Sequence, residues 1–186
     1  MPDASAPDLA DLLDPSAIRL AEAAVDRDDA IRRSGQALVD AGAVDGSYVD
    51  AMLRREQSVS TYLGEGFAIP HGTLAAKDAV RRDALAFVRF PDGVDWGAGT
   101  VTVCVAIAAR GNGHVAVLGR LAQILIDPDR ARDLREASDA DEVLRLLRPD
   151  DGTDDEDPSR TRHFDDHEDS DDSDDSDDSD DEETAQ

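Results

Sequence analysis

Apolar residues recur along the chain at two different spacings, and the two spacings alternate. Helical spacing predicts helices over residues 28–42, 47–57 and 115–125. Two shorter helices are expected over residues 129–137 and 138–148, where the last begins with a capping pattern of small polar residues. These helices provide most of the apolar faces that a folded domain would have to bury.

Short runs of apolar and β-branched residues between these helices predict strands. They fall at residues 17–20, 67–69, 85–90 and 101–108. The last run is apolar at nearly every position, as expected for a strand inside a sheet that is covered on both faces. Pro91-Asp-Gly93 is typical of a turn, so we expect the chain to reverse there and return briefly over residues 94–96. Helices that alternate with strands predict one α/β domain.

The composition changes at residue 149. Residues 150–186 contain almost no apolar side chains, and a Ser-Asp-Asp unit repeats from Ser170 onward. Such a segment cannot bury enough apolar surface to offset its chain entropy, so we expect a disordered acidic tail over residues 149–186. Residues 1–14 are short and acidic and are expected to form a partly ordered extension. The folded domain should therefore span residues 15–148.

The net charge of −25 is concentrated in that tail. Residues 149–186 contain 20 acidic and 2 basic residues, which leaves a net charge of −7 for the rest of the chain. A nucleic-acid partner or an acidic membrane surface is disfavoured, because each requires a basic face. Lys77 is the only lysine, so nearly all basic residues are arginine. An acidic chain with so little lysine is typical of halophilic proteins, although a GC-rich genome would explain part of the preference for arginine.

Cys104 is the only cysteine, which excludes an internal disulfide and suits a reducing compartment. Its place in an apolar strand predicts a small buried hydrophobic residue rather than a redox site. No apolar run reaches the roughly 18 residues of a membrane span, and the first residues show no secretory leader. We therefore expect a soluble protein in the cytoplasm, with no direct membrane insertion.

One histidine follows a predicted strand directly. Pro70 biases Ile69 toward extended geometry, and Gly72 should leave open space beside the ring of His71. We therefore expect His71 at the end of a strand rather than inside the core. By its chemistry alone, a single loop histidine is more often a structural or surface residue than a catalytic one.

Two further residues are candidates for binding an anion. Arg55 lies in the last turn of the predicted helix over residues 47–57, where a solvated arginine is the simpler interpretation. His114 follows a Gly-Asn-Gly link at the junction of a strand and a helix, which favours anions. A helix N-terminus disfavours a charged imidazolium, so His114 could donate a hydrogen bond as a neutral ring. A simple polar residue in the first turn is the alternative.

Three motifs surround these candidates: Arg55-Glu56, Thr61-Tyr-Leu-Gly64 and Ala68-Ile-Pro-His-Gly-Thr73. With them the chain resembles the enzyme IIA domains of the mannitol/fructose class, which belong to the phosphoenolpyruvate:sugar phosphotransferase system. The resemblance covers residues 15–148. It implies an α/β sandwich, in which a mixed β-sheet is flanked by helices, and the predicted order of elements agrees with that fold. The acidic tail departs from the family's pattern.

The resemblance also implies roles for the candidate residues. His71 would be the phosphoryl acceptor, Arg55 would help to bind the phosphoryl group, and His114 would lie close to His71. The group would come from the phosphocarrier protein HPr and attach to Nε2 of His71. It would then pass to a cysteine or histidine of a cognate enzyme IIB, which serves a sugar permease. The resemblance implies no cofactor or metal. His163 and His167 lie among carboxylates in the tail, where solvated side chains are favoured over a cation site.

Three functions remain open from the sequence. The first is a IIA component for uptake of fructose, mannitol or a related sugar, and the Thr61-Tyr-Leu-Gly64 segment is more similar to mannitol domains without fixing the sugar. The second is a regulatory module of the nitrogen-related branch, in which the phosphohistidine signals to partners. The third is a non-catalytic acidic protein whose tail recruits basic partners.

Overall fold

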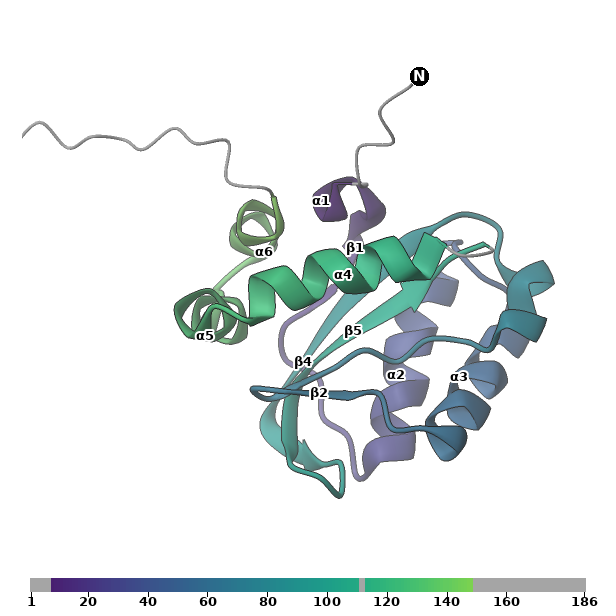
Figure 1. Ribbon diagram of the computed structural model, residues 1–186, viewed down its shortest axis with the longest axis horizontal. Helices are drawn as coiled ribbons and strands as arrows, with labels where there is room; N and C mark the ends of the chain where they lie inside the picture. The colour runs from purple at the N-terminus through teal and green to yellow at the C-terminus, as the bar shows by residue number, and fades with distance from the viewer. Residues whose placement is uncertain (1–7, 111–112, 149–186) are drawn as a thin grey trace, which may run out of the picture. The chain divides into compact units, whose positions relative to one another are not determined.

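The computed structural model describes residues 8–110 and 113–148, and the strands in this part of the chain form one mixed sheet (Figure 1). They are β1 (Leu13–Arg19), β2 (Tyr62–Gly64), β3 (Phe67–Ala68), β4 (Ala84–Asp95) and β5 (Thr100–Ala108). Their order in the sheet is β1-β4-β5-β3-β2. β4 and β5 are antiparallel, whereas β1 runs parallel to β4 and β3 runs parallel to β5.

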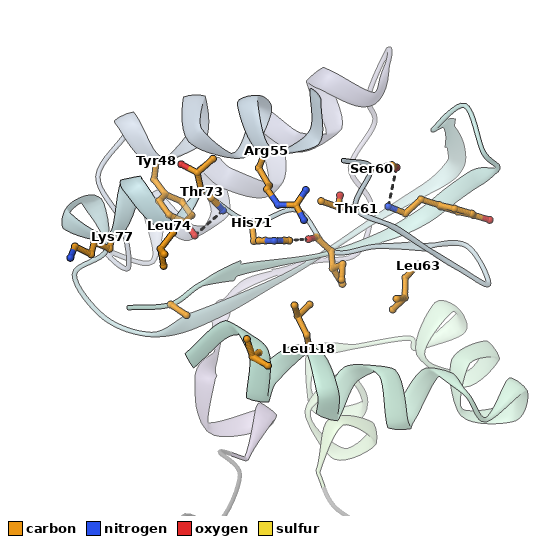
Figure 2. A pocket seen from close by; sticks show the side chains of 15 residues that line it. Tyr48, Arg55, Ser60, Thr61, Leu63, His71, Thr73, Leu74, Lys77 and Leu118 are labelled. Carbon is orange, nitrogen blue, oxygen red and sulfur yellow. Dashed lines mark hydrogen bonds between the residues drawn. The ribbon is translucent and has the colours of Figure 1, made fainter. Parts of the chain in front are cut away.

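Helices cover both faces of the sheet. α2 (Arg27–Asp40) packs on β1, β4 and β5, and α3 (Ser47–Ser58) packs beside α2. α4 (Gly113–Leu125) lies across the opposite face, and Figure 2 shows side chains of α3 and α4 on the two sides of the sheet. The remaining elements are α1 (Leu9–Leu12), α5 (Pro128–Glu136), α6 (Ala140–Leu147) and the 3-10 helix η1 (Leu74–Ala79). The predicted α/β sandwich with a mixed, helix-flanked sheet is confirmed.

The core lies on both faces of β4 and β5. Every residue from Val103 to Ala108 is buried, because this strand is central and covered by helices on both sides. Cys104 is fully buried, as predicted, and burial raises the pKa of its thiol to about 12. The thiol therefore stays protonated near neutral pH and behaves as a small apolar residue.

The predicted turn at Pro91-Asp-Gly93 is wrong, because β4 continues through it. Arg89 pairs with Val103 and Val94 pairs with Val101, so four residues of β4 bulge opposite a single residue of β5. A bulge tolerates Pro91 because the missing N–H is not needed where the ladder is interrupted. The chain reverses later, after the end of β4 at Asp95.

The first residues described also belong to the fold. α1 begins after Asp8, whose carboxylate accepts a hydrogen bond from the N–H of Ala10 at 2.9 Å. Leu9 and Leu13 are buried, and β1 starts at Leu13 rather than at residue 17. The expectation of a partly ordered extension is therefore wrong for residues 9–14, because so short an apolar run shows no recognisable period.

The predicted acidic tail, with His163 and His167, lies outside the described residues. Within the ranges that are described, none of the helices combines the length and the apolar character needed to cross a membrane. The same ranges contain no cluster of three or more His, Cys, Asp or Glu side chains arranged to hold a metal ion.

Candidate functional site

A pocket of about 610 Å³ lies beyond the end of β3, beside the last residues of the parallel strand β5 (Figure 2). Ile69 and His71 line it just after β3, and Ala109 lines it just after β5. Ligands of open α/β sheets bind at the carboxyl ends of neighbouring strands, because loops and helix N-termini converge there. The sheet order, rather than proximity in sequence, therefore creates this pocket.

His71 is set more deeply than expected. Its backbone forms an isolated parallel bridge with Ile107 of β5, and the residue is only 8% exposed, although it lines the pocket. The expected open space beside Gly72 is filled by the ring of Tyr48, and a side chain at residue 72 would collide with that ring. Glycine is required at this position because an aromatic ring packs against the backbone.

A backbone hydrogen bond determines which nitrogen of His71 carries the proton. Nδ1 lies 2.8 Å from the carbonyl oxygen of Ile69. A carbonyl oxygen can only accept a hydrogen bond, so Nδ1 must donate. In the neutral ring the lone pair then belongs to Nε2. The fold therefore presents Nε2 as the nucleophilic nitrogen of His71.

Arg55 extends from the last turn of α3 toward His71, and both residues line the pocket (Figure 2). Its Nη1 donates a hydrogen bond to the carbonyl oxygen of Val59 at 2.8 Å, which fixes the guanidinium at the end of the helix. A guanidinium has five N–H donors, so one anchoring bond leaves others that can bind an anion. The structure thus brings two of the three predicted residues into one pocket.

His114 is the second residue of α4, which begins directly beyond the loop that follows β5. Val115 and Leu118, on the same helix, line the pocket. The backbone of His114 therefore lies at the end of α4 that borders the pocket. The His114 side chain is not among the described parts of the chain. The first N–H groups of a helix lack partners within the helix, so this end of α4 favours an anion.

The sequence analysis includes Glu56 in the Arg55-Glu56 motif but gives it no role. In the structure Glu56 is 4% exposed and accepts four hydrogen bonds. Its partners are the N–H of Thr61 at 2.8 Å, the hydroxyl of Thr61, the hydroxyl of Ser60 at 3.0 Å and Nε1 of Trp96 at 2.8 Å. One signal was available, because Tyr48, Met52 and Glu56 follow at intervals of four residues. Glu56 thus continues an apolar stripe of α3, where a charged residue is unexpected.

Tyr48 lies in the helix predicted over residues 47–57, and its hydroxyl connects three elements. Its hydroxyl donates to the carbonyl oxygen of Ile107 at 2.9 Å and accepts from the N–H of Gly72 at 2.9 Å. Burial raises the pKa of Tyr48, so the hydroxyl remains a donor at neutral pH. Tyr48 therefore fixes the backbone directly after His71 to both α3 and β5.

The rim of the pocket is apolar and exposed. Leu63, Leu74 and Val115 have 41%, 63% and 60% of their surface accessible. Lys77 lies at the same rim. Exposed apolar side chains gathered around a pocket are typical of a surface that another protein covers.

The family model described as phosphoenolpyruvate-dependent sugar phosphotransferase system, EIIA 2, matches residues 11–149. The chain is 44% identical over 127 residues to the multiphosphoryl transfer protein of Salmonella typhimurium, a match that covers 68% of this chain and 34% of that protein. The chain is also 39% identical over 121 residues to the mannitol-specific phosphotransferase enzyme IIA component of Staphylococcus aureus. That match covers 65% of this chain and 84% of the relative.

A solved structure has a similar fold. It is the complex of enzyme IIAMtl and phosphorylated enzyme IIBMtl from Escherichia coli, with a TM-score of 0.67 and 37% identity. The similarity covers 73% of this chain and 98% of the matched chain. The matched region thus spans about a third of the Salmonella relative but nearly all of one chain in the complex.

Proposed function

Because the chain belongs to the EIIA 2 family of the phosphoenolpyruvate-dependent sugar phosphotransferase system, we propose that His71 carries a phosphoryl group between two partner proteins. The donor is phosphorylated HPr and the acceptor is a cognate enzyme IIB. The proposal rests on the hydrogen bond from His71 Nδ1 to the carbonyl oxygen of Ile69, which makes Nε2 the nucleophile. A neutral imidazole is nucleophilic near pH 7 and forms an N–P bond that breaks easily again.

The transfer proceeds in two displacements. The lone pair of Nε2 attacks the phosphorus atom of the donor, an N–P bond forms, and the donor's own bond to phosphorus breaks with its electron pair returning to the donor. Nδ1 keeps its proton and its bond to Ile69, so the positive charge that develops on the ring faces a carbonyl dipole. A nucleophile of enzyme IIB then attacks phosphorus, and Nε2 recovers its lone pair.

The phosphoryl group needs positive groups around its equatorial oxygens during both steps. Arg55 can supply N–H donors from α3, and the first N–H groups of α4 can supply more from the opposite side. His114, at the same end of α4, would donate a hydrogen bond as a neutral ring. Arg55 and the backbone of α4 are already in place before the transfer, so little reorganisation of these groups is needed.

Mannitol or a related sugar is the proposed final acceptor of the phosphoryl group in the pathway that this domain serves. The Staphylococcus relative is named for mannitol, and the Escherichia structure contains phosphorylated enzyme IIBMtl. Both names support a role in transport rather than the regulatory alternative. They also support enzyme IIB as the acceptor. We place the domain in the cytoplasm, where a carrier protein and a permease-linked IIB can both reach it.

The test is to mix the protein with HPr phosphorylated on its histidine and to identify the modified residue by mass spectrometry. Label should appear on His71 and be absent from His71→Ala. His114→Ala should be labelled about tenfold more slowly, as expected for the loss of one neutral hydrogen bond. A chain ending at residue 148 should be labelled at the normal rate. Label on a folded His71→Ala variant would contradict the assignment, and dependence on the tail would favour an acidic binding function.

A further inference from the structure

We propose that Glu56 is a positioning residue, whose buried carboxylate sets the orientation and the tautomer of His71 through a series of backbone hydrogen bonds. Nothing in the transfer chemistry described above uses Glu56. Removing a carboxylate from water is costly unless hydrogen bonds replace the lost hydration. Glu56 has four such bonds, so the fold maintains this group at 4% exposure by surrounding it with donors.

All four partners are donors, and they are divided equally between the two oxygens. Oε2 receives the N–H and the hydroxyl of Thr61, and Oε1 receives the hydroxyl of Ser60 and Nε1 of Trp96. In glutamine an NH₂ group would replace one of these two oxygens. Whichever way the amide is turned, its NH₂ group would face two hydrogen-bond donors. The site is therefore specific for a carboxylate.

Three hydrogen bonds connect this carboxylate to the ring of His71. The N–H of Thr61 donates to Glu56 at 2.8 Å, and the carbonyl oxygen of Thr61 accepts from the N–H of Ile69 at 3.0 Å. The carbonyl oxygen of Ile69 then accepts from Nδ1 of His71 at 2.8 Å. Glu56 thus fixes Thr61, Thr61 fixes Ile69, and the carbonyl group of Ile69 holds the imidazole.

The position of Glu56 in α3 explains why this arrangement matters. Arg55 is the adjacent residue and lines the same pocket as His71. One turn of α3 therefore fixes the position of the Arg55 guanidinium. The same turn fixes the position of the His71 ring through Thr61 and Ile69. Phosphoryl transfer requires in-line geometry, and a displacement of about 1 Å can cost on the order of a hundredfold in rate. A rigid connection between the two groups maintains that geometry without touching the substrate.

The inference depends on His71 being the acceptor, and its test separates the two claims. Nitrogen NMR of ¹⁵N-histidine-labelled protein measures the tautomer of His71, assigned by its absence in His71→Ala, and does not require phosphorylation. In Glu56→Gln we expect a smaller fraction of the Nδ1–H tautomer and acceptance from phosphorylated HPr slowed by about tenfold or more. Glu22→Gln is the matched control, because Glu22 pairs with Arg33 at 3.2 Å and does not line the pocket.

A second variant covers the case in which Glu56→Gln fails to fold. Thr61→Val keeps the shape of the side chain and the N–H bond to Glu56 but removes the hydroxyl donor. It should change the tautomer and the rate in the same direction by a smaller factor. A folded Glu56→Gln or Thr61→Val protein with the wild-type tautomer and a rate within twofold of wild type would overturn the inference. A changed tautomer with label on another residue would instead contradict only the assignment of His71.

Discussion

The two helices that border the pocket meet it in different ways. α3 holds the acceptor segment with directional hydrogen bonds, which the N–H of Gly72 donates to Tyr48 and the N–H of Thr61 donates to Glu56. α4 presents the apolar side chains of Val115 and Leu118. Hydrogen bonds depend steeply on angle and distance, whereas apolar contact does not depend on direction. The α3 side therefore fixes geometry, and the α4 side offers a surface that can adapt.

A domain that receives a group from one protein and gives it to another needs both properties. The reacting atoms must meet in one geometry in both transfers, which calls for a rigid side. The two partners have different surfaces, and apolar contact accommodates both more easily than fixed polar pairs do. Changes on the α3 side should thus slow the chemical step, whereas changes to the exposed apolar side chains of α4 should weaken the encounter.

Among variants that keep His71, the largest effect on the rate of phosphoryl acceptance is expected at Arg55. Arg55→Met keeps the length of the side chain and removes the charge, so phosphoryl acceptance should fall by about 10² to 10³, the usual cost of losing one preorganised donor to a developing anion. Arg55→Lys should recover only part of this rate, because an ammonium group cannot bind two oxygens side by side. Single-turnover quench experiments with phosphorylated HPr measure the rate.

Arg54 provides the control for this prediction. It precedes Arg55 on α3, is exposed and does not line the pocket. Arg54→Met should transfer at the wild-type rate, and a similar loss in both variants would mean that the net charge of the helix, rather than the guanidinium in the pocket, accounts for the effect.

Tyr48→Phe tests the other anchor on the α3 side. The substitution removes one oxygen and leaves the N–H of Gly72 and the carbonyl oxygen of Ile107 without that partner. The free energy of unfolding should fall by about 1 to 3 kcal/mol, the cost of unsatisfied buried groups, and acceptance should slow severalfold as the loop after His71 loosens. Urea unfolding and the single-turnover assay measure the two effects.

Because burial raises the pKa of Tyr48, the difference in unfolding free energy between wild type and Tyr48→Phe should not depend on pH between 6 and 9. An unfolding free energy equal to that of the wild type would show that the hydroxyl contributes nothing to the site.

Local patterns were sufficient to predict much of the fold but not the contacts that hold the site together. The helices and the central strand at residues 101–108 follow from periodicity, which depends only on neighbouring residues. The bulge at residues 90–93 can be recognised only with the partner strand, so Pro91 and Gly93 by themselves predict a turn. A bulge and a turn share the same local residues and differ only in what lies opposite them.

The same distinction holds at the site. His71 and Arg55 were identified from motifs in the sequence, and the structure places both in one pocket. The hydroxyl of Tyr48 reaches a carbonyl group 59 residues away, and Glu56 reaches a tryptophan 40 residues away. Nothing in the local sequence encodes such partners. The roles of these two residues became visible only when the topology had brought α3, β5 and the loop after β3 together.

The smallest effect is expected at Val115, where the two sides of the pocket should differ most clearly. Val115 is 60% exposed, so Val115→Ser should change the free energy of unfolding by less than about 0.5 kcal/mol. A partner protein that covers the rim would lose about 1 kcal/mol of apolar contact, which raises KM for the phosphorylated donor about fivefold and leaves kcat unchanged.

Ile126→Ser is the matched control, because Ile126 is 79% exposed just beyond the end of α4 and does not line the pocket. A lower kcat with an unchanged KM in Val115→Ser would mean that the apolar side chains of α4 shape the chemistry as α3 does, and the contrast between α3 and this apolar surface would have to be abandoned.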